Sequence, residues 1–206
     1  MIRQQICEVG RMLWQRGLVG ATEGNISVRL DEQHILCTPS GVSKGHLQAT
    51  DLVVIDYEGK SSTSNTPSSE IRMHLRMYAR RTDCMAVVHA HPLTATGFAL
   101  AGESLPNDAM PGSTVVLGPV ALVPFGMPGT EDLPNTLEPF LADHKTFLLS
   151  HHGAVVMGSD VKNAYHRMEI LERTAQIVLT ARMLGGAKQM PLEAVETLNR
   201  LSKGNP

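Results

Sequence analysis

Cysteine is scarce in this chain of 206 residues. The three cysteines, Cys7, Cys37 and Cys84, are widely spaced, and none belongs to a Cys-x-x-Cys pair. An odd and sparse set argues against a disulfide framework and against a thiolate metal site, and it is typical of proteins in a reducing compartment. We therefore expect a cytoplasmic protein, in which any metal ligands come from other residue types.

Aromatic residues, clustered positive charge and long apolar runs are also missing. Aromatic residues make up 4% of the chain, and the formal net charge is −2 with no basic run. Proteins that bind nucleic acid usually present a basic patch, and single-strand binders add aromatic stacking platforms. No apolar stretch approaches the length of a membrane-spanning helix, and the first five residues lack the apolar core of a signal peptide. We expect neither nucleic acid nor a membrane as a partner.

The residues that are present suit a globular protein with a sizeable core. Hydrophobic residues make up 42% of the chain and charged residues 18%. The length fits one domain, and neither an internal repeat nor a linker divides the sequence. We expect a single domain over residues 1–206.

Apolar periodicity outlines the expected elements. It predicts helices over residues 2–16, 93–101, 133–141, 161–184 and 192–201, and a further helix that opens within Thr66-Pro67-Ser68-Ser69-Glu70. Alternating or β-branched runs predict strands over residues 26–30, 35–38, 52–56, 85–88, 114–117, 120–123, 146–149 and 154–157. Trp14 should be a core anchor of the first helix, and residues 61–66, which are polar, should form a surface loop.

The segment His89-Ala90-His91 lies at the end of a predicted strand, before Pro92. Because side chains alternate along a strand, the two histidines point the same way, roughly 6.5 to 7 Å apart along the strand. Two imidazoles at that separation can both reach one metal ion, although a lone His-x-His can equally be two unrelated histidines.

A second pair, His151-His152, follows the predicted strand 146–149 and precedes Gly153. One of these histidines is a natural third ligand, but the spacing does not choose between them. Three imidazoles leave a divalent ion with an open position, which is typical of a catalytic zinc site.

Three short segments combine small residues with hydroxyl or amide side chains: Gly24-Asn25, Ser40-Gly41 and Ser68-Ser69. Glycine lets backbone N–H groups approach an anion closely, and a helix N-terminus attracts phosphate. Each segment alone is more typical of a turn or a helix cap, but together they could hold one phosphate. None has the lysine or the spacing of a nucleotide P-loop, which argues against ATP. Glu70 follows the serines directly, so it could be a metal ligand, a proton carrier or both.

The ordered set of these motifs resembles the class II aldolase/adducin family, and in particular its members that cleave L-fuculose 1-phosphate. The similarity extends from about Gly10 to Leu184, and it rests on Gly24-Asn25-Ile26-Ser27, Thr38-Pro39-Ser40-Gly41, Ser68-Ser69-Glu70, His89-Ala90-His91 and His152-Gly153. The resemblance implies an α/β fold in three layers, α/β/α, around a central and mostly antiparallel sheet. It also implies a zinc enzyme that forms a homotetramer.

The resemblance further implies a role for each motif. His89, His91 and His152 would bind Zn²⁺, and Glu70 would be the catalytic acid/base that also binds zinc in the empty site. The phosphate of a small phosphorylated sugar would lie against Gly24, Asn25, Ser40, Gly41, Ser68 and Ser69. Such an enzyme is a class II, metal-dependent aldehyde-lyase of carbohydrate metabolism. It cleaves a ketose 1-phosphate reversibly to dihydroxyacetone phosphate and an aldehyde, through a metal-stabilised enediolate.

Other members of the family suggest three alternatives. The fuculose-type aldolases have a tyrosine and a phenylalanine at the positions that align with Met110 and Pro128 of this chain. The same metal site could therefore serve a decarboxylase of a 3-oxo sugar-acid phosphate or a 4-epimerase of a pentulose phosphate. The similar epimerases carry aspartate at the position of Glu70, and the decarboxylases commonly carry lysine at the position of Ser69. A binding module of the adducin type would lack the three histidines.

Overall fold

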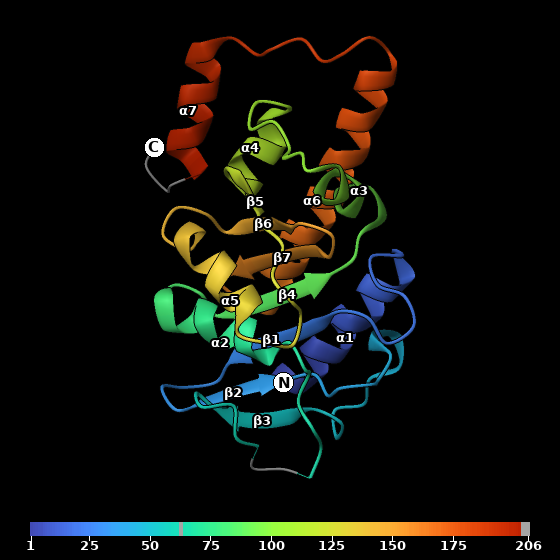
Figure 1. Cartoon of the computed structure of the whole chain (residues 1–206), viewed down its shortest axis with the longest axis vertical. Helices are drawn as coiled ribbons and strands as arrows, with labels where there is room; N and C mark the ends of the chain where they lie inside the picture. Colours follow the sequence, from blue (N-terminus) through green and yellow to red (C-terminus); the bar gives the residue numbers. More distant parts are fainter. Residues whose placement is uncertain (62–63, 203–206) are drawn as a thin grey trace.

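The computed structural model describes residues 1–61 and 64–202 (Figure 1). Residues 62–63 of the expected surface loop, and residues 203–206 of the expected single domain, lie outside the described residues. The helices are α1 (Ile2–Gln15), α2 (Ile71–Arg80), α3 (Leu93–Ala101), α4 (Pro111–Leu117), α5 (Asp132–Leu137), α6 (Val161–Met183) and α7 (Leu192–Ser202). Two short 3-10 turns are η1 (Lys44–His46) and η2 (Glu138–Phe140). No described helix is both long and apolar enough to cross a membrane.

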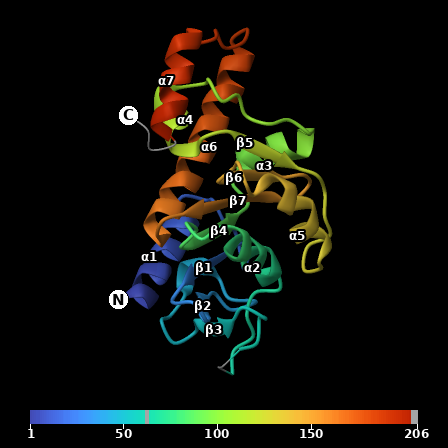
Figure 2. The same ribbon diagram turned by 90° about the vertical axis from the view of Figure 1, so that its left-hand side faces the viewer.

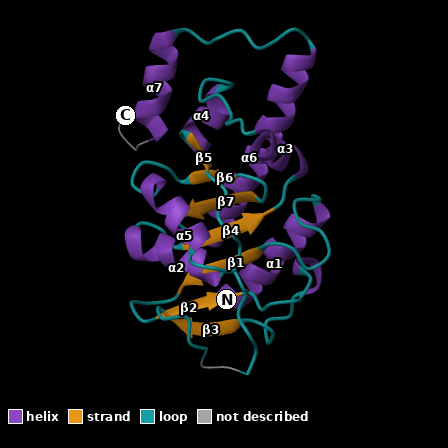
Figure 3. Cartoon of the chain, viewed as in Figure 1, coloured by secondary structure: helices purple, strands orange, loops and turns teal. Residues whose placement is uncertain are grey.

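One mixed sheet organises the described residues (Figure 3). Its strands are β1 (Asn25–Arg29), β2 (His34–Cys37), β3 (Val53–Asp56), β4 (Ala86–Ala90), β5 (Val120–Val123), β6 (Thr146–Leu149) and β7 (Gly153–Gly158). Their order across the sheet is β3-β2-β1-β4-β7-β6-β5. Neighbours run antiparallel except β5 and β6, which are parallel. The expected mostly antiparallel sheet therefore contains one parallel pair at its edge.

Helices cover both faces of this sheet (Figure 2). On one face, α1, α3 and α6 pack against side chains that include Val88 of β4 and Val156 of β7. On the other face, α2 and α5 pack against Val87 and Val155 of the same two strands. This division follows from the alternation of side chains along each strand. Because every residue of β4 is buried, His89 lies in the interior, on the face that α2 covers.

Residues 114–117 are not a strand, which corrects the sequence-based expectation. They belong to α4, in which Pro111 occupies the first turn, where its fixed φ suits a helix. The hydroxyl group of Thr114 donates to the carbonyl of Met110, one turn back, and to that of Asn107. The helix also packs against α6 and α7, and these tertiary contacts outweigh the weak preference of a β-branched run for strands.

The helix expected to open at Thr66 begins at Ile71. Before it, Pro67 forms a bridge with Pro39, and the backbone N–H of Ser68 donates to the carbonyl of Thr38. Ser68 therefore lies beside Thr38, and Ser69 lies in the turn that leads into α2, so both serines precede the helix.

Trp14 is not a core anchor, because 44% of it is exposed. Its ring covers Gly45 and lies 5.4 Å from the ring of His46.

Candidate metal centre

Three histidine rings converge at one end of the central strands. His89 is the penultimate residue of β4, His91 directly follows that strand, and His152 lies in the turn that precedes β7. Their ring centroids are 4.9 Å apart for His89 and His91, 4.7 Å for His89 and His152, and 5.2 Å for His91 and His152. One nitrogen from each ring lies within 4.8 Å of the others, so the three could hold one metal ion.

Strand pairing explains why distant histidines meet here. Alternation puts His89 and His91 on one face of β4. Antiparallel pairing sets Ala90 of β4 opposite Ala154 of β7, which brings the turn before β7 next to His91. A Cβ atom on Gly153 would lie 2.6 Å from Cδ2 of His91, so only glycine permits this approach.

The structure also distinguishes the two adjacent histidines. His152 joins the cluster, whereas His151 is exposed and its ring lies 6.4 Å from that of Phe125. His151 has a φ of +56°, a left-handed conformation that is uncommon for a residue with a Cβ atom.

The carboxylate of Glu70 lies against two of the rings. Its Oε2 is 3.2 Å from Nε2 of His89, and its Oε1 is 3.0 Å from Nε2 of His152. The amide of Asn25 donates a 2.9 Å hydrogen bond to Oε2. Burial by itself would raise the pKa of Glu70, but the adjacent His89 and His152 rings hold it well below its usual range. The carboxyl group is therefore ionised in this arrangement.

The second nitrogens of the His89 and His91 rings face oxygen atoms of the protein. Nδ1 of His89 donates to the carbonyl of Ala154 at 2.9 Å, which leaves Nε2 facing the cluster. Nδ1 of His91 lies 3.6 Å from Oε1 of Glu23. Such partners fix the tautomer of a metal-binding histidine and raise its basicity. No sequence pattern pointed to Glu23, because only the pairing of β1 with β4 brings it to His91.

The donor set suits a divalent ion such as zinc. Burial, together with the nearby rings of His89 and His152, lowers the pKa of His91 to about 4. The ring is therefore neutral at pH 7, and a neutral imidazole is the form that binds metals. Three imidazole nitrogens and a carboxylate oxygen are all common zinc ligands.

A buried polar chain lies behind Glu70. Ser27 of β1 is 2.7 Å from Nδ1 of His74 and 2.8 Å from the hydroxyl group of Tyr78. Both partners belong to α2, and His74 lies one turn after Glu70. The sequence analysis missed this chain, which attaches the first turn of α2 to the sheet.

The expected phosphate-binding segments lie close to one another and to the cluster. A Cβ atom on Gly24 would lie 2.7 Å from the carbonyl oxygen of His89. The backbone N–H of Ser40 donates to Thr66, beside Ser68 and its hydrogen bond to Thr38. The exception is the side chain of Asn25, which the sequence assigned to phosphate and which bonds to Glu70 in the structure.

The loop that contains Pro128 flanks the serine pair. Its Gly129 lies near Ser69, and the carbonyl of Gly129 accepts a hydrogen bond from Arg72. Met110 precedes α4, on a different part of the chain.

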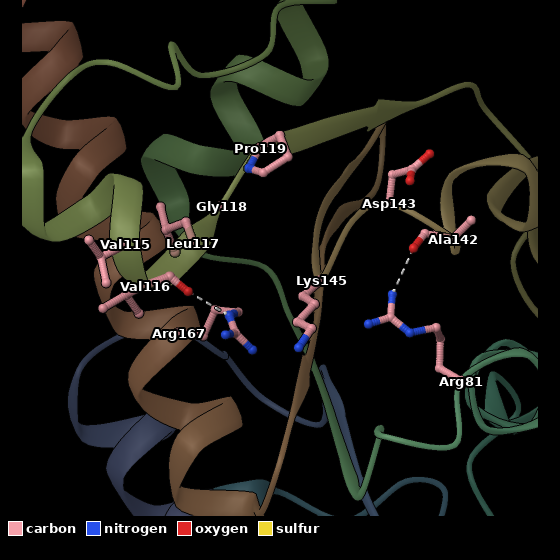
Figure 4. A pocket seen from close by; sticks show the side chains of 10 residues that line it. All are labelled: Arg81, Val115, Val116, Leu117, Gly118, Pro119, Ala142, Asp143, Lys145 and Arg167. Atoms are coloured by element: carbon pink, nitrogen blue, oxygen red, sulfur yellow. Dashed lines mark hydrogen bonds between the residues drawn. The ribbon is translucent and has the colours of Figure 1, made fainter. Parts of the chain in front are cut away.

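A separate cavity of about 300 Å³ lies at the other end of the strands (Figure 4). Arg81, Lys145 and Arg167 line it, but their donors are largely in use. Arg81 donates to the carbonyl of Leu141, and Arg167 donates to that of Val116. The cavity contains none of the clustered residues, and we assign it no part in the metal centre.

Comparison with known proteins agrees with this geometry. Residues 4–179 match the family described as the class II aldolase and adducin N-terminal domain. The chain is 35% identical to a 3-oxo-tetronate 4-phosphate decarboxylase of Haemophilus influenzae, over 86% of this chain and 87% of that protein. It is 31% identical to an L-fuculose phosphate aldolase of Methanococcus maripaludis, over 84% and 93% of the two chains.

Solved structures show the same similarity. An L-fuculose 1-phosphate aldolase superposes with a TM-score of 0.89 at 29% identity, over 98% of this chain and 96% of that one. The motifs expected from the sequence and the matched fold therefore point to the same group of proteins. This chain belongs to the class II aldolase and adducin N-terminal domain family.

Proposed function

We propose that this chain is a metal-dependent lyase of carbohydrate metabolism. It breaks a carbon–carbon bond next to the carbonyl group of a small phosphorylated sugar derivative. The observation that carries the proposal is the convergence of His89, His91 and His152 with the ionised carboxylate of Glu70. Three histidine ligands leave one coordination position of a metal ion open for substrate, which is typical of catalytic zinc sites.

The three histidines would hold Zn²⁺, with Glu70 as a further ligand before substrate binds. A divalent ion held there supplies Lewis acidity toward a substrate carbonyl. Ala154 and Glu23 keep the rings of His89 and His91 in their orientations throughout.

Glu70 would carry the proton that the reaction needs. When the carbon–carbon bond breaks, its electron pair stays on the carbon beside the carbonyl group, and that carbon must then receive a proton. A substrate that separates Glu70 from the His89 and His152 rings removes the contacts that lower its pKa. The carboxyl group can then be protonated and donate to that carbon, and in the reverse direction it removes the proton.

The remaining segments would position the substrate. Gly24 and Gly41 would offer backbone N–H groups to a phosphate, and Ser40, Ser68 and Ser69 would offer hydroxyl groups, with Asn25 bonded to Glu70 beside them. Holding the phosphate fixes the reacting carbon relative to Glu70, and such orientation lowers the barrier by several kcal/mol when the geometry is right.

Two substrate classes fit the proposed phosphate-binding segments and the metal centre. Decarboxylation of a 3-oxo-tetronate 4-phosphate and aldol cleavage of a ketose 1-phosphate both leave dihydroxyacetone phosphate. They differ in the fragment that departs, which is carbon dioxide or an aldehyde. Decarboxylation is supported by the 35% identity to a decarboxylase and by Met110 and Pro128, which offer no aromatic group to an aldehyde. Aldol cleavage is supported by the 31% identity to an aldolase and by Ser69, where decarboxylases commonly have lysine.

The departing fragment therefore decides between the two reactions. Zinc-loaded protein is incubated with each substrate class, and carbon dioxide and aldehyde are measured directly, since dihydroxyacetone phosphate is common to both. Protein carrying Glu70→Gln is the control. Formation of neither product with Zn²⁺, Mn²⁺ or Co²⁺ bound would refute the proposed lyase activity.

We also propose that the protein is a cytoplasmic homotetramer. Large apolar side chains on and beside α3 and α6 are exposed, including Leu93 and Met183, at 82% and 81%. Grouped apolar exposure is typical of subunit interfaces. Light scattering of the purified protein tests this, and a monomer at micromolar concentration would refute it.

A further inference from the structure

Lys44 is a fully internal cation. It begins η1, it is 2% exposed, and its Nζ donates to the carbonyl groups of Thr22 at 2.8 Å and Val42 at 2.6 Å. Within residues 1–61 and 64–202 it forms no ion pair with a carboxylate. Burial of a charge without a counter-charge is costly, so its retention needs a reason beyond the two carbonyl contacts.

Two glycines hold the backbone of Lys44 in place. A Cβ atom on Gly10 of α1 would lie 2.5 Å from the carbonyl oxygen of Lys44, and one on Gly45 would lie 2.6 Å from Cγ of Trp14. Glycine inside a helix destabilises it relative to alanine. At Gly10 the absence of a side chain lets α1 lie directly on η1, which offsets this cost. The ammonium group therefore extends from a fixed backbone.

The two carbonyl groups belong to two of the proposed phosphate-binding segments. Thr22 lies two residues before Gly24, and Val42 directly follows Gly41. The ammonium group thus joins residues 20–24 to residues 40–44. The third segment is already attached, since Ser40 and Ser68 donate to Thr66 and Thr38 across the Pro39–Pro67 bridge.

We infer that Lys44 is a positioning residue for a phosphorylated substrate. Its ammonium group holds the Gly24 and Gly41 segments at one separation and places a fixed positive charge behind them. The bound phosphate dianion is the counter-charge that the protein itself does not supply. This inference rests on the proposed function. It differs from the role of a P-loop lysine, because Lys44 acts through the loops and its hydrogen bonds go to the chain.

The protonation of Lys44 agrees with this role. Burial lowers the pKa of Lys44 to about 8. The side chain is therefore still mainly charged at pH 7, and a phosphate nearby favours the charged form.

The test is a pair of Lys44 variants with a matched control. Lys44→Met removes the charge and both hydrogen bonds, Lys44→Gln keeps a donor without the charge, and Lys60→Met makes the same change at an exposed lysine that pairs with Glu58. Inorganic phosphate is titrated into each zinc-loaded protein by calorimetry, and steady-state kinetics are measured with the phosphorylated substrate.

Lys44→Met should weaken phosphate binding and raise KM by about tenfold or more, the size of one or two hydrogen bonds to a charged group. Its kcat and zinc content should change little, and Lys60→Met should resemble the unaltered protein. Equal phosphate affinity in Lys44→Met and the unaltered protein overturns the inference, as does a loss confined to kcat or zinc. If Lys44→Met does not fold, Lys44→Gln decides by the same criteria.

A measurement on the unaltered protein adds a readout that needs no variant. Phosphate should shift the side-chain NMR signal of Lys44 and leave that of Lys60 in place, and an unmoved Lys44 signal at saturation contradicts the inference. Ser68→Ala and Gly41→Ala distinguish failure of the proposed phosphate site from failure of the proposed role of Lys44. If they too leave phosphate affinity unchanged, the proposed phosphate site itself is wrong. If only they weaken binding, the role of Lys44 alone is wrong.

Discussion

Asn25 and Glu70 are joined by a 2.9 Å hydrogen bond from the side-chain amide to the carboxylate. Asn25 also lies opposite His89 in the pairing of β1 with β4. One residue of β1 therefore sets the position of Glu70 relative to a proposed metal ligand, and a carboxylate that must exchange a proton with substrate depends on that position.

Asn25→Ala removes the donor that orients Glu70. We expect kcat to fall by about 10-fold to 100-fold, the effect of losing a partner that orients a functional group. Zinc content should be unchanged. Kinetics and metal analysis of the same sample check this, and an unaltered kcat would show that the imidazoles alone position the carboxylate.

Glu70→Gln keeps the size of the side chain and removes its proton exchange. We expect kcat to fall by about 10²-fold to 10⁴-fold, which is the usual contribution of a general acid or base. The three histidines should still bind zinc. The measurement is product formation per bound zinc, and near-normal turnover would exclude Glu70 as the acid/base.

Glu23→Gln replaces the carboxylate that faces Nδ1 of His91 with a neutral amide. Loss of such a partner typically lowers metal affinity about 10-fold to 100-fold. Competition with a chelator of known affinity measures the change. Glu32→Gln, at an exposed acid in the turn after β1, is the matched control and should bind zinc normally.

The buried imidazole of His74 predicts a pH dependence of stability. Burial, followed by the effect of nearby His89, lowers the pKa of His74 from 6.5 to about 3. Between these values the unfolded chain binds a proton that the folded chain does not. The free energy of unfolding should therefore decrease as the pH falls from about 6.5 to about 3, and His91, with its pKa of about 4, acts in the same direction.

Urea unfolding of metal-free protein at pH 7 and pH 4.5 checks this dependence. In His74→Gln the difference between the two pH values should be smaller. The exposed His166 offers a control, since His166→Gln should keep the full difference. An equal pH dependence in His74→Gln would assign the effect to other groups.

His151→Gly should stabilise the protein, because His151 adopts a φ of +56°. A non-glycine residue in this conformation is strained by about 1–2 kcal/mol, partly offset by the greater flexibility of glycine when unfolded. We expect an increase of about 0.5–1 kcal/mol in the free energy of unfolding. His151→Ala keeps the Cβ atom and should not show the gain. A lower melting temperature for the glycine variant would indicate that the His151 side chain makes stabilising contacts.

The sequence by itself determined those features that depend on neighbouring residues. The shared direction of His89 and His91 follows from the alternation of side chains in any strand. The order of the motifs along the chain is enough to indicate the family, which the family match over residues 4–179 confirms. Most of the strands were also predicted to within about one residue, because their apolar runs are continuous.

Only the tertiary structure decided the features that depend on distant segments. It brought His152, which the family resemblance already favoured over His151, to the other two rings through the turn before β7, and it brought Glu23 to His91. It turned residues 114–117 into a helix, in which the carbonyl groups of Val116 and Leu117 accept hydrogen bonds from Arg167 and Thr146. It also enclosed Lys44 between two loops. Each of these outcomes depends on groups that approach one another only after the sheet has formed, so no local pattern of residues records them.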